Sequence, residues 1–392
     1  MGWRKFKADL IFTGTETLPS ESVLVTEESG FIQEIIPVRD AGDGIESFDG
    51  LLVPGLINTH CHLELSHMKG VISTGTGLVE FLTRVIKQRN FASSDLKLEM
   101  ELADSEMYNK GIVAVGDICN TTDSIPVKQT SKIHWRNFIE VIGFTEQHAA
   151  ERLKYSGNIL TRFKETLLHP SSLTPHAPYS VSESLFLLIN EECRGGIISI
   201  HNQETEAEND LYRSNSGAIF QLYKNLQIDP SFFKATGKSS LQSYLPWLGN
   251  QQKTLLVHNT YTSGEDIQFT GSNNGEEHTY FCICINANRY IESANPPLEL
   301  LRAQHCKITI GTDSYASNRH LDVLEELKTI QQQFPKIPLS EMLAWATING
   351  ANALDMQEKL GSFEPGKQPG VVLINYLENQ KLTAQSTARR II

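Results

Sequence analysis

The first 50 residues alternate short apolar runs with turn residues. Three runs, ADLIFTG, ESVLVTE and GFIQEIIP, are each bounded by glycine, proline or acidic residues, a pattern typical of short β-strands. After about residue 360 the chain returns to this pattern, with VVLINY followed by KLTAQSTARRII. Because the two ends resemble each other and differ from the middle, we predict a small composite β-sandwich domain built from both termini, residues 1–54 and 359–392.

Between these ends, short apolar runs alternate with longer amphipathic stretches. Helical spacing of apolar residues is clear at residues 77–89 and 321–334. The apolar runs are LLVPGLI, GIVAVGDI, FIEVIGF, SSLTPH, GIISIH, TLLVH, TYFCICI and KITIGTD. Eight strands with interleaved helices indicate a parallel α/β architecture, and a closed (β/α)8 barrel of the TIM type over residues 55–358 explains the count best. An open doubly wound sheet is the competing fold, but no G-x-G-x-x-G follows an early strand.

Composition narrows the class of protein. The 46 acidic and 34 basic residues give a net charge of −12, which disfavours a nucleic-acid polymer or an anionic membrane as partner because no basic surplus neutralises phosphates. Six cysteines form no C-x-x-C pair, as expected of reduced thiols. The start of the chain lacks the apolar core of a signal peptide, and no window approaches the roughly 18 apolar residues of a membrane span. We therefore expect a cytoplasmic protein.

The densest chemical signal is NTHCHLELSH, residues 58–67, which directly follows LLVPGLI. In an extended strand the side chains at i and i+2 lie on one face, so His60 and His62 can converge on one ion. Cys61 then points the other way, and His67 lies beyond the end of the strand. Taken alone, an H-x-H pair also arises by chance.

Three other apolar runs end in residues with related chemistry. GIISIH ends in His201, TLLVH in His258 and KITIGTD in Asp313. In a β/α barrel the carboxyl ends of the strands gather at one mouth, where active sites lie. We therefore predict that these three residues share one site with the two histidines of the first motif.

These motifs, in this order, resemble those of the amidohydrolase superfamily, and more narrowly its cytosine deaminase and chlorohydrolase-like branch. PGLINTHCH resembles the first-strand motif of that family, HNQE its fifth-strand H-x-x-E, LLVHN its sixth-strand histidine and GTDS its eighth-strand aspartate. GSFEPGK, residues 361–367, resembles the return of the chain into the β domain. The resemblance covers nearly the whole chain.

The resemblance implies one divalent ion, Zn²⁺ with Fe²⁺ as the alternative, held by His60, His62, His201 and Asp313. Three nitrogen ligands and one carboxylate leave room for water, which fits a catalytic site. Binuclear members of the superfamily use a carboxylated lysine at the end of the fourth strand. That run here reads SLTPHAPYS, with no lysine, which favours a single ion.

Catalytic roles also follow from the resemblance. A divalent ion lowers the pKa of its bound water to about 7, and Asp313 can accept the proton of that water. Glu204 would protonate a ring nitrogen of the substrate, although a surface charge in the acidic run ETEAEND is the alternative. His258 would orient the hydroxide or polarise the departing group; a hydrogen-bonded core histidine is the alternative here.

His176 and Asn288 match family positions that contact the substrate. His176 lies between two prolines in TPHAPYS, where it could instead brace a loop. Asn288 closes CINAN, which resembles the C-P-x-S-N motif of the family. That run carries Ile285 in place of proline and Asn286 where a basic residue is common, so the motif does not identify the substrate.

Three further positions near the motifs have simpler explanations. Phe81 occupies a place where the family often has an aromatic lid residue, but helix packing explains it equally well. Glu64 follows His62 by two residues and could accept a hydrogen bond that supports the site. Cys282 and Cys284 share a strand face, yet they would over-fill the ligand set, so we expect them in the core.

Together these features predict a metal-dependent hydrolase that cleaves a C–N bond other than a peptide bond, by deaminating an aminated heterocycle or nucleoside. The same site could instead expel chloride from a triazine or open a cyclic amide. A non-catalytic scaffold is disfavoured because all five chemical positions are intact. The expected partner is a small nitrogen heterocycle, not a nucleic-acid polymer or a membrane, and the resemblance also allows a homodimer.

Overall fold

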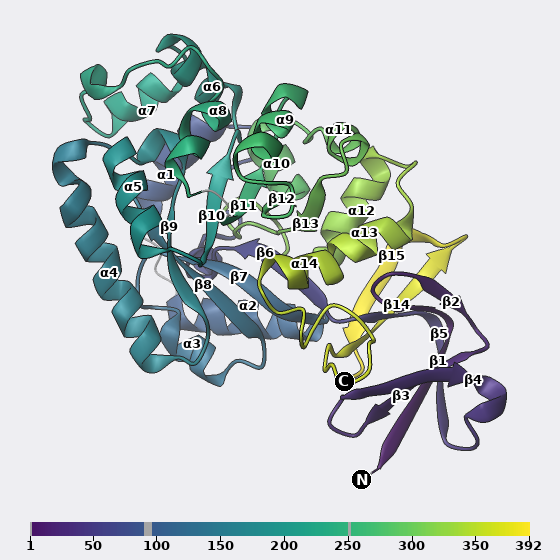
Figure 1. Ribbon diagram of the computed structural model, residues 1–392. Helices are drawn as coiled ribbons and strands as arrows, with labels where there is room; N and C mark the ends of the chain where they lie inside the picture. Colours follow the sequence, from purple (N-terminus) through teal and green to yellow (C-terminus); the bar gives the residue numbers. More distant parts are fainter. Residues whose placement is uncertain (1, 90–95, 250–251) are drawn as a thin grey trace.

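The computed structural model of the protein describes residues 2–89, 96–249 and 252–392 (Figure 1). A large region of strands and helices occupies the middle of the chain, and a separate β-sheet holds both chain ends. Met1 and residues 90–95 and 250–251 lie outside the described residues.

The strands of the large region form two parallel sheets of four strands each. The first has the order β6 (Leu56–Cys61), β7 (Ile112–Cys119), β8 (His134–Val141), β9 (Ser171–Pro175). The second has the order β10 (Ile197–Asn202), β11 (Lys253–His258), β12 (Thr279–Ile283), β13 (Lys307–Ile310). Each of the eight runs selected from the sequence overlaps one of these strands, although most of LLVPGLI lies in β5 (Ile45–Pro54) and only its last two residues begin β6. The eight strands are almost continuously buried because parallel strands are covered on both faces.

Backbone hydrogen bonds also link the two sheets to each other at both pairs of edge strands. Between β9 and β10, the N–H of His201 donates to the carbonyl of His176 over 3.0 Å. Just after β13, the N–H of Asp313 donates to the carbonyl of His60 over 3.1 Å, and Asp313 forms a parallel bridge with Cys61. These contacts bring the carboxyl ends of β6, β10 and β13 together.

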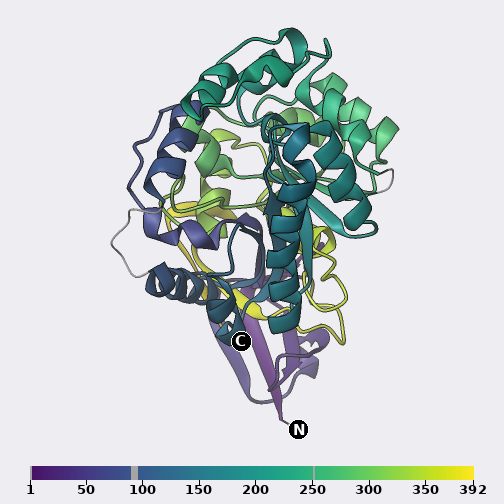
Figure 2. The same ribbon diagram turned by 90° about the vertical axis from the view of Figure 1, so that its left-hand side faces the viewer.

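Helices cover the outside of the two sheets (Figures 1 and 2). The predicted helices at residues 77–89 and 321–334 correspond to α1 and α12. The N-terminus of α12 is capped by Asp322, whose carboxylate accepts from the N–H of Leu324. The helices are α1 (Leu78–Gln88), α2 (Leu96–Asn109), α3 (Ile125–Thr130), α4 (Ala149–Thr166), α5 (Glu183–Glu192), α6 (Glu206–Ser214), α7 (Ile219–Asn225), α8 (Ser240–Tyr244), α9 (Gly264–Asn273), α10 (Ile285–Glu292), α11 (Leu298–Ala303), α12 (Val323–Gln333), α13 (Leu339–Trp345) and α14 (Ile348–Ala353).

One apolar cluster lies apart from the main core, over the carboxyl ends of the strands. It joins α1 to α7 and α6 through buried residues such as Phe81, Leu222 and Tyr212. Helices α1 and α7 lie side by side in it, as Figure 2 shows. This layer covers the mouth where the candidate chemical residues meet.

The two ends of the chain share one seven-stranded sheet with the order β15-β14-β5-β1-β3-β4, to which β2 adds by pairing with β1. The two ends meet where β5 runs antiparallel to β14, with Leu52 opposite Leu373. The strands are β1 (Trp3–Phe12), β2 (Thr17–Pro19), β3 (Ser22–Glu27), β4 (Ile32–Pro37), β5 (Ile45–Pro54), β14 (Val371–Glu378) and β15 (Lys381–Arg390). Among the described residues, no helix combines the length and apolar character needed to cross a membrane.

Candidate active site

Four of the selected side chains meet at the carboxyl ends of β6 and β10 and just after β13. The potential ligand atoms of His60, His62, His201 and Asp313 all lie within 4.8 Å of one another, and all four residues are buried. The Nε2 atom of His62 lies 3.1 Å from Nε2 of His60 and 3.3 Å from Nε2 of His201. Oδ1 of Asp313 lies 3.5 Å and 3.3 Å from the Nε2 atoms of His60 and His62.

The protonation of this cluster fits a divalent cation. His201 Nδ1 lies 2.8 Å from the carbonyl of His176, which places the ring proton on Nδ1 and turns the Nε2 lone pair toward the cluster. Burial lowers the pKa of His62 to about 3 and that of His201 well below its usual range, with neighbouring imidazoles adding to the effect. The rings are therefore neutral, as metal ligands must be.

Asp313 supplies the negative charge of the cluster. Burial favours its protonated form, but a hydrogen bond from His60 and the nearby rings of His62 and His258 outweigh burial and hold the pKa of this carboxyl well below its usual range. The hydroxyl of Ser317 donates to Oδ2 of Asp313. Neutral imidazoles with an ionised carboxylate form a donor set typical of catalytic zinc.

The backbone is strained where two of the chemical residues sit. Asp313 has φ +58° and His258 has φ +75°, a left-handed conformation that is costly for residues with a side chain and that clusters at functional sites. Gly311 allows the chain to pass close beneath the site, since a Cβ added there would lie 2.8 Å from Cβ of His60. The surrounding structure therefore holds Asp313 and His258 in backbone conformations that are unfavourable in themselves.

His258 is oriented by Asn288. Nδ1 of His258 lies 2.8 Å from Oδ1 of Asn288, and Nδ2 of Asn288 donates to the carbonyl of His258 over 3.2 Å. Asn288 is fully buried behind this ring and is not part of the cavity wall. Asn288 therefore positions His258, and its contact with the substrate stays a prediction.

Glu204 faces His258 across the cavity. Its Oε1 lies 3.6 Å from Nε2 of His258. Burial raises the pKa of Glu204 well above its usual range, and the charges of Asp313 and Glu292 add to this shift. This shift favours the protonated form of the carboxyl, the form that a proton donor needs. Its burial, 4% exposed, is unlike that of a charge in a solvated acidic run.

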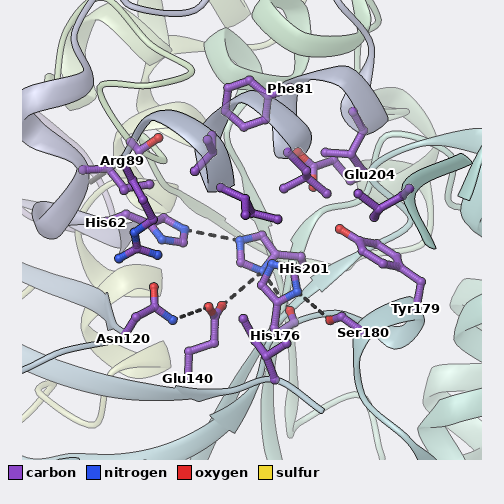
Figure 3. Close-up of a pocket in the computed structure, with 18 of the residues that line it drawn as sticks. His62, Phe81, Arg89, Asn120, Glu140, His176, Tyr179, Ser180, His201 and Glu204 are labelled. Carbon is purple, nitrogen blue, oxygen red and sulfur yellow. Dashed lines mark hydrogen bonds and ion pairs between the residues drawn. The ribbon is translucent and has the colours of Figure 1, made fainter. Parts of the chain in front are cut away.

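These residues line a cavity of about 160 Å³ (Figure 3). Phe81 and other apolar residues of α1 and α7 form one wall. Polar groups next to the cluster form another, namely Arg89, Asn120, Glu140, His176 and Ser180. His176 therefore lies where a substrate contact was expected, with its Nδ1 2.6 Å from Oγ of Ser180.

The remaining selected residues support the site or belong to the core. The carboxylate of Glu64 accepts from the backbone N–H of Asn120 over 3.0 Å and supports the segment after β7. His67 lies against the carbonyl of Arg89. Cys282 and Cys284 are fully buried in a small apolar cluster, as expected.

Sequence reasoning missed Asn120 and Glu140. Asn120 directly follows β7, and Glu140 is the residue before the last of β8. Both therefore occupy the carboxyl end of a strand, the position that selected the histidines. This positional signal was present, but neither residue belongs to a motif with ligand spacing.

The fold and the donor set define a hydrolase class, and the chain belongs to the amidohydrolase family, which it matches over residues 51–392. It is similar to the 5-methylthioadenosine/S-adenosylhomocysteine deaminase of Teredinibacter turnerae, with 27% identity over 344 residues that cover 83% of this chain and 72% of that protein. The aminofutalosine deaminase of Helicobacter pylori, solved with methylthio-coformycin, has a TM-score of 0.83 and 22% identity, covering 99% and 100% of the two chains. The atrazine chlorohydrolase of Arthrobacter aurescens TC1, solved with zinc, has a TM-score of 0.70 and 14% identity, covering 94% and 86%.

Proposed function

We propose that this member of the amidohydrolase family is a deaminase that hydrolyses the C–N bond of an aminated nitrogen heterocycle, most favourably one carried by a nucleoside. The observation that carries this proposal is the buried carboxyl of Glu204, which faces His258 beside a cluster of four potential metal ligands. Several similar proteins are named as deaminases of nucleosides, which supports it.

A divalent ion would be held by the cluster of His60, His62, His201 and Asp313, with Zn²⁺ proposed ahead of Fe²⁺. When bound, such an ion would lower the pKa of water to about 7 and so supply a nucleophile at neutral pH. The donor set of nitrogen and carboxylate ligands fits either metal. The zinc of the chlorohydrolase neighbour supports the first choice.

The residues of the chain divide the proton transfers between them. Asp313 is ionised and can take the proton of the attacking water, whereas Glu204 is protonated and can give a proton to a ring nitrogen of the substrate. His258, fixed by Asn288, presents Nε2 toward the same space and can hold or polarise the reacting groups. The two carboxyls thus differ in protonation because their surroundings differ.

Loss of chloride from a triazine or opening of a cyclic amide at this site is the alternative function. The chlorohydrolase neighbour shares the fold. Ammonia leaves only after its nitrogen has gained a proton, whereas chloride leaves as an anion. Deamination is favoured because the similar proteins include several named as nucleoside deaminases.

The closure of the barrel, the domain bounds and the sandwich are also proposals. We infer that the two parallel sheets close into one eight-stranded barrel over residues 55–358, supported by the backbone bonds at both pairs of edge strands. Residues 1–54 and 359–392 would form the composite domain, whose sheet would fold into a sandwich around buried residues such as Phe6, Leu24 and Phe363. A homodimer and a cytoplasmic location are retained as predictions.

Ammonia release from purified protein tests the function. The substrates should include aminated purine bases, their ribonucleosides and a chlorinated triazine, each with zinc-replete and chelator-treated enzyme. We expect ammonia from a nucleoside in the zinc-replete sample alone. Release of chloride, or ring opening without ammonia, would contradict the deaminase proposal.

A further inference from the structure

Glu140 is a buried carboxylate in the cavity wall that the proposed chemistry does not use. Only 6% of its surface is exposed. Its Oε2 accepts a hydrogen bond from Nδ2 of Asn120 over 2.7 Å. Its Oε1 is also buried and has no hydrogen-bond partner among the described residues. Because an unpartnered buried carboxylate oxygen is costly, a ligand that brings a donor to it would bind more tightly.

The direction of Glu140 follows from the alternation of side chains along β8. Trp135, Ile139 and Val141 pack with the outer helices in the main core, so Glu140 points to the opposite face, toward the cavity. Figure 3 shows its carboxylate between Asn120 and His201.

Hydrogen bonds within the protein fix this carboxylate before any ligand binds. Glu64 accepts from the backbone N–H groups of Asn120 and Thr121, which holds the segment after β7. Asn120 then donates to Glu140, and the hydroxyl of Ser156 on α4 donates to the carbonyl of Glu140 over 3.0 Å. An acceptor oriented in advance adds to affinity and to selectivity.

No neighbouring group of the protein takes the free oxygen. Nδ1 of His201 lies 3.8 Å from Oε1 of Glu140, too far for a hydrogen bond, and this Nδ1 is already 2.8 Å from the carbonyl of His176. Arg89 lines the same cavity, but within the described part of the chain no ion pair joins it to Glu140. The free oxygen is therefore available to a ligand.

We infer that Glu140 is a specificity-determining residue that accepts a hydrogen bond from a sugar hydroxyl of the substrate. The inference rests on the proposed function, in which the substrate is an aminated nucleoside. Glu140 lies on the Nδ1 side of His201, whereas the ligand cluster lies on the Nε2 side. In the proposed orientation of the substrate, the amine of the base faces the cluster and the sugar extends toward Glu140.

The chemistry of a carboxylate suits a sugar hydroxyl. Acidic side chains accept from ribose hydroxyls in dinucleotide-binding proteins. The same negative charge repels a phosphate or carboxylate placed near it. Glu140 therefore selects nucleosides with free sugar hydroxyls and disfavours substrates with an anionic group at this end of the cavity.

Glu140→Gln tests the inference, because it replaces the free acceptor oxygen with an amide of nearly the same shape. Ammonia release is followed with adenosine and with 2′,3′-dideoxyadenosine. We expect wild-type kcat/KM to favour adenosine by about 10- to 100-fold, the usual value of a hydrogen bond to a charged group. Glu140→Gln should lose most of this preference because its kcat/KM for adenosine falls, whereas its kcat/KM for dideoxyadenosine stays nearly unchanged. Glu151→Gln, which removes an exposed charge on α4, is the matched control.

Three results would overturn the inference. Equal kcat/KM values of the wild-type enzyme for the two nucleosides would overturn it before any variant is made. Equal losses on both nucleosides, or loss of zinc from Glu140→Gln, would show that Glu140 positions His201 instead. If Glu140→Gln is unstable, Glu140→Asp provides the same comparison with the carboxylate drawn back. Failure of the proposed function is distinct, since wild-type enzyme would then release no ammonia from any nucleoside.

Discussion

At the scale of single residues, the site depends on groups whose protonation is set by burial. Burial lowers the pKa of His62 and His201, whereas a hydrogen bond from His60 and the nearby rings of His62 and His258 hold the pKa of Asp313 well below its usual range. Burial and the charges of Asp313 and Glu292 raise the pKa of Glu204 well above its usual range. Two carboxyls in one cavity thus gain opposite roles from their surroundings.

The first residue-scale prediction concerns the ligand His201. His201→Ala should lower metal affinity by more than about 100-fold, since even residues that only orient a ligand typically account for about 10- to 100-fold. Metal content measured after dialysis against a weak chelator should fall together with ammonia release. His148→Ala, at an exposed histidine, should change neither; retention of stoichiometric metal by His201→Ala would remove it from the ligand set.

Glu204→Gln should separate chemistry from metal binding. The amide cannot donate the acidic proton, so kcat should fall by about 10²- to 10⁴-fold while metal content stays at the wild-type level. Since burial raises the pKa of Glu204 and favours its protonated form, wild-type kcat should decline as pH rises through that pKa. A pH profile of kcat would check this. Metal loss in the variant would make Glu204 a ligand.

At the scale of helices and strands, the spacing of apolar residues and the short apolar runs were sufficient to locate the strands of both parallel sheets. They were not sufficient for side chains whose partners are distant in sequence. Lys128 in IPVKQT reads as an ordinary exposed lysine, yet it is almost fully buried. Its Nζ donates to Oδ2 of Asp117 over 2.5 Å and to Oδ1 of Asn137 over 2.8 Å, which joins α3 to β7 and β8.

This buried lysine gives an element-scale prediction. Lys128→Ala would leave the carboxylate of Asp117 buried without its cation, which typically destabilises a protein by about 3–5 kcal/mol. Denaturant unfolding of the metal-free protein should show the loss. Lys154→Ala, at an exposed lysine of α4, should leave stability within about 0.5 kcal/mol of wild type. An unchanged midpoint for Lys128→Ala would show that the pair contributes nothing to stability.

Sequence patterns also locate some residues of the site and miss those whose partners are distant in sequence. The histidines and Asp313 were found because each ends an apolar run, and that position alone brings them together. Asn288 belongs to one of the sequence motifs, but packing places its side chain behind His258. The spacing of residues in the sequence does not reveal this arrangement. Glu140 became visible only when the wall of the cavity was known.

At the scale of the whole molecule, both termini close one sheet, and the resemblance of the two chain ends predicted this sharing. Pairing of β5 with β14 ties residues more than 300 positions apart. The chain therefore begins in the composite sheet, continues through the parallel sheets and returns to the composite sheet. Whether the composite sheet folds into a sandwich depends on its curvature, which alternation of apolar residues does not encode.

Buried carboxyls also make the stability of the whole molecule depend on pH. Burial raises the pKa of Glu208 to about 8 and that of Glu326 to about 8, against hydrogen bonds that favour ionisation. Their folded-state pKa values lie above the unfolded value of 4.5, so the folded state binds these protons more tightly. The resulting stability is fully present below about pH 4.5 and is lost as pH rises through about 8.

We therefore expect the thermal midpoint to fall between pH 6 and pH 9 at constant ionic strength, as measured by calorimetry on protein with fixed metal content. Glu208→Gln should flatten part of this slope, because the amide stays neutral while its oxygen still accepts from the N–H of Gln203. Glu151→Gln should leave the slope unchanged. A midpoint that rises over this range, or an equal slope in Glu208→Gln, would mean that Glu208 ionises in the folded protein as readily as in the unfolded chain.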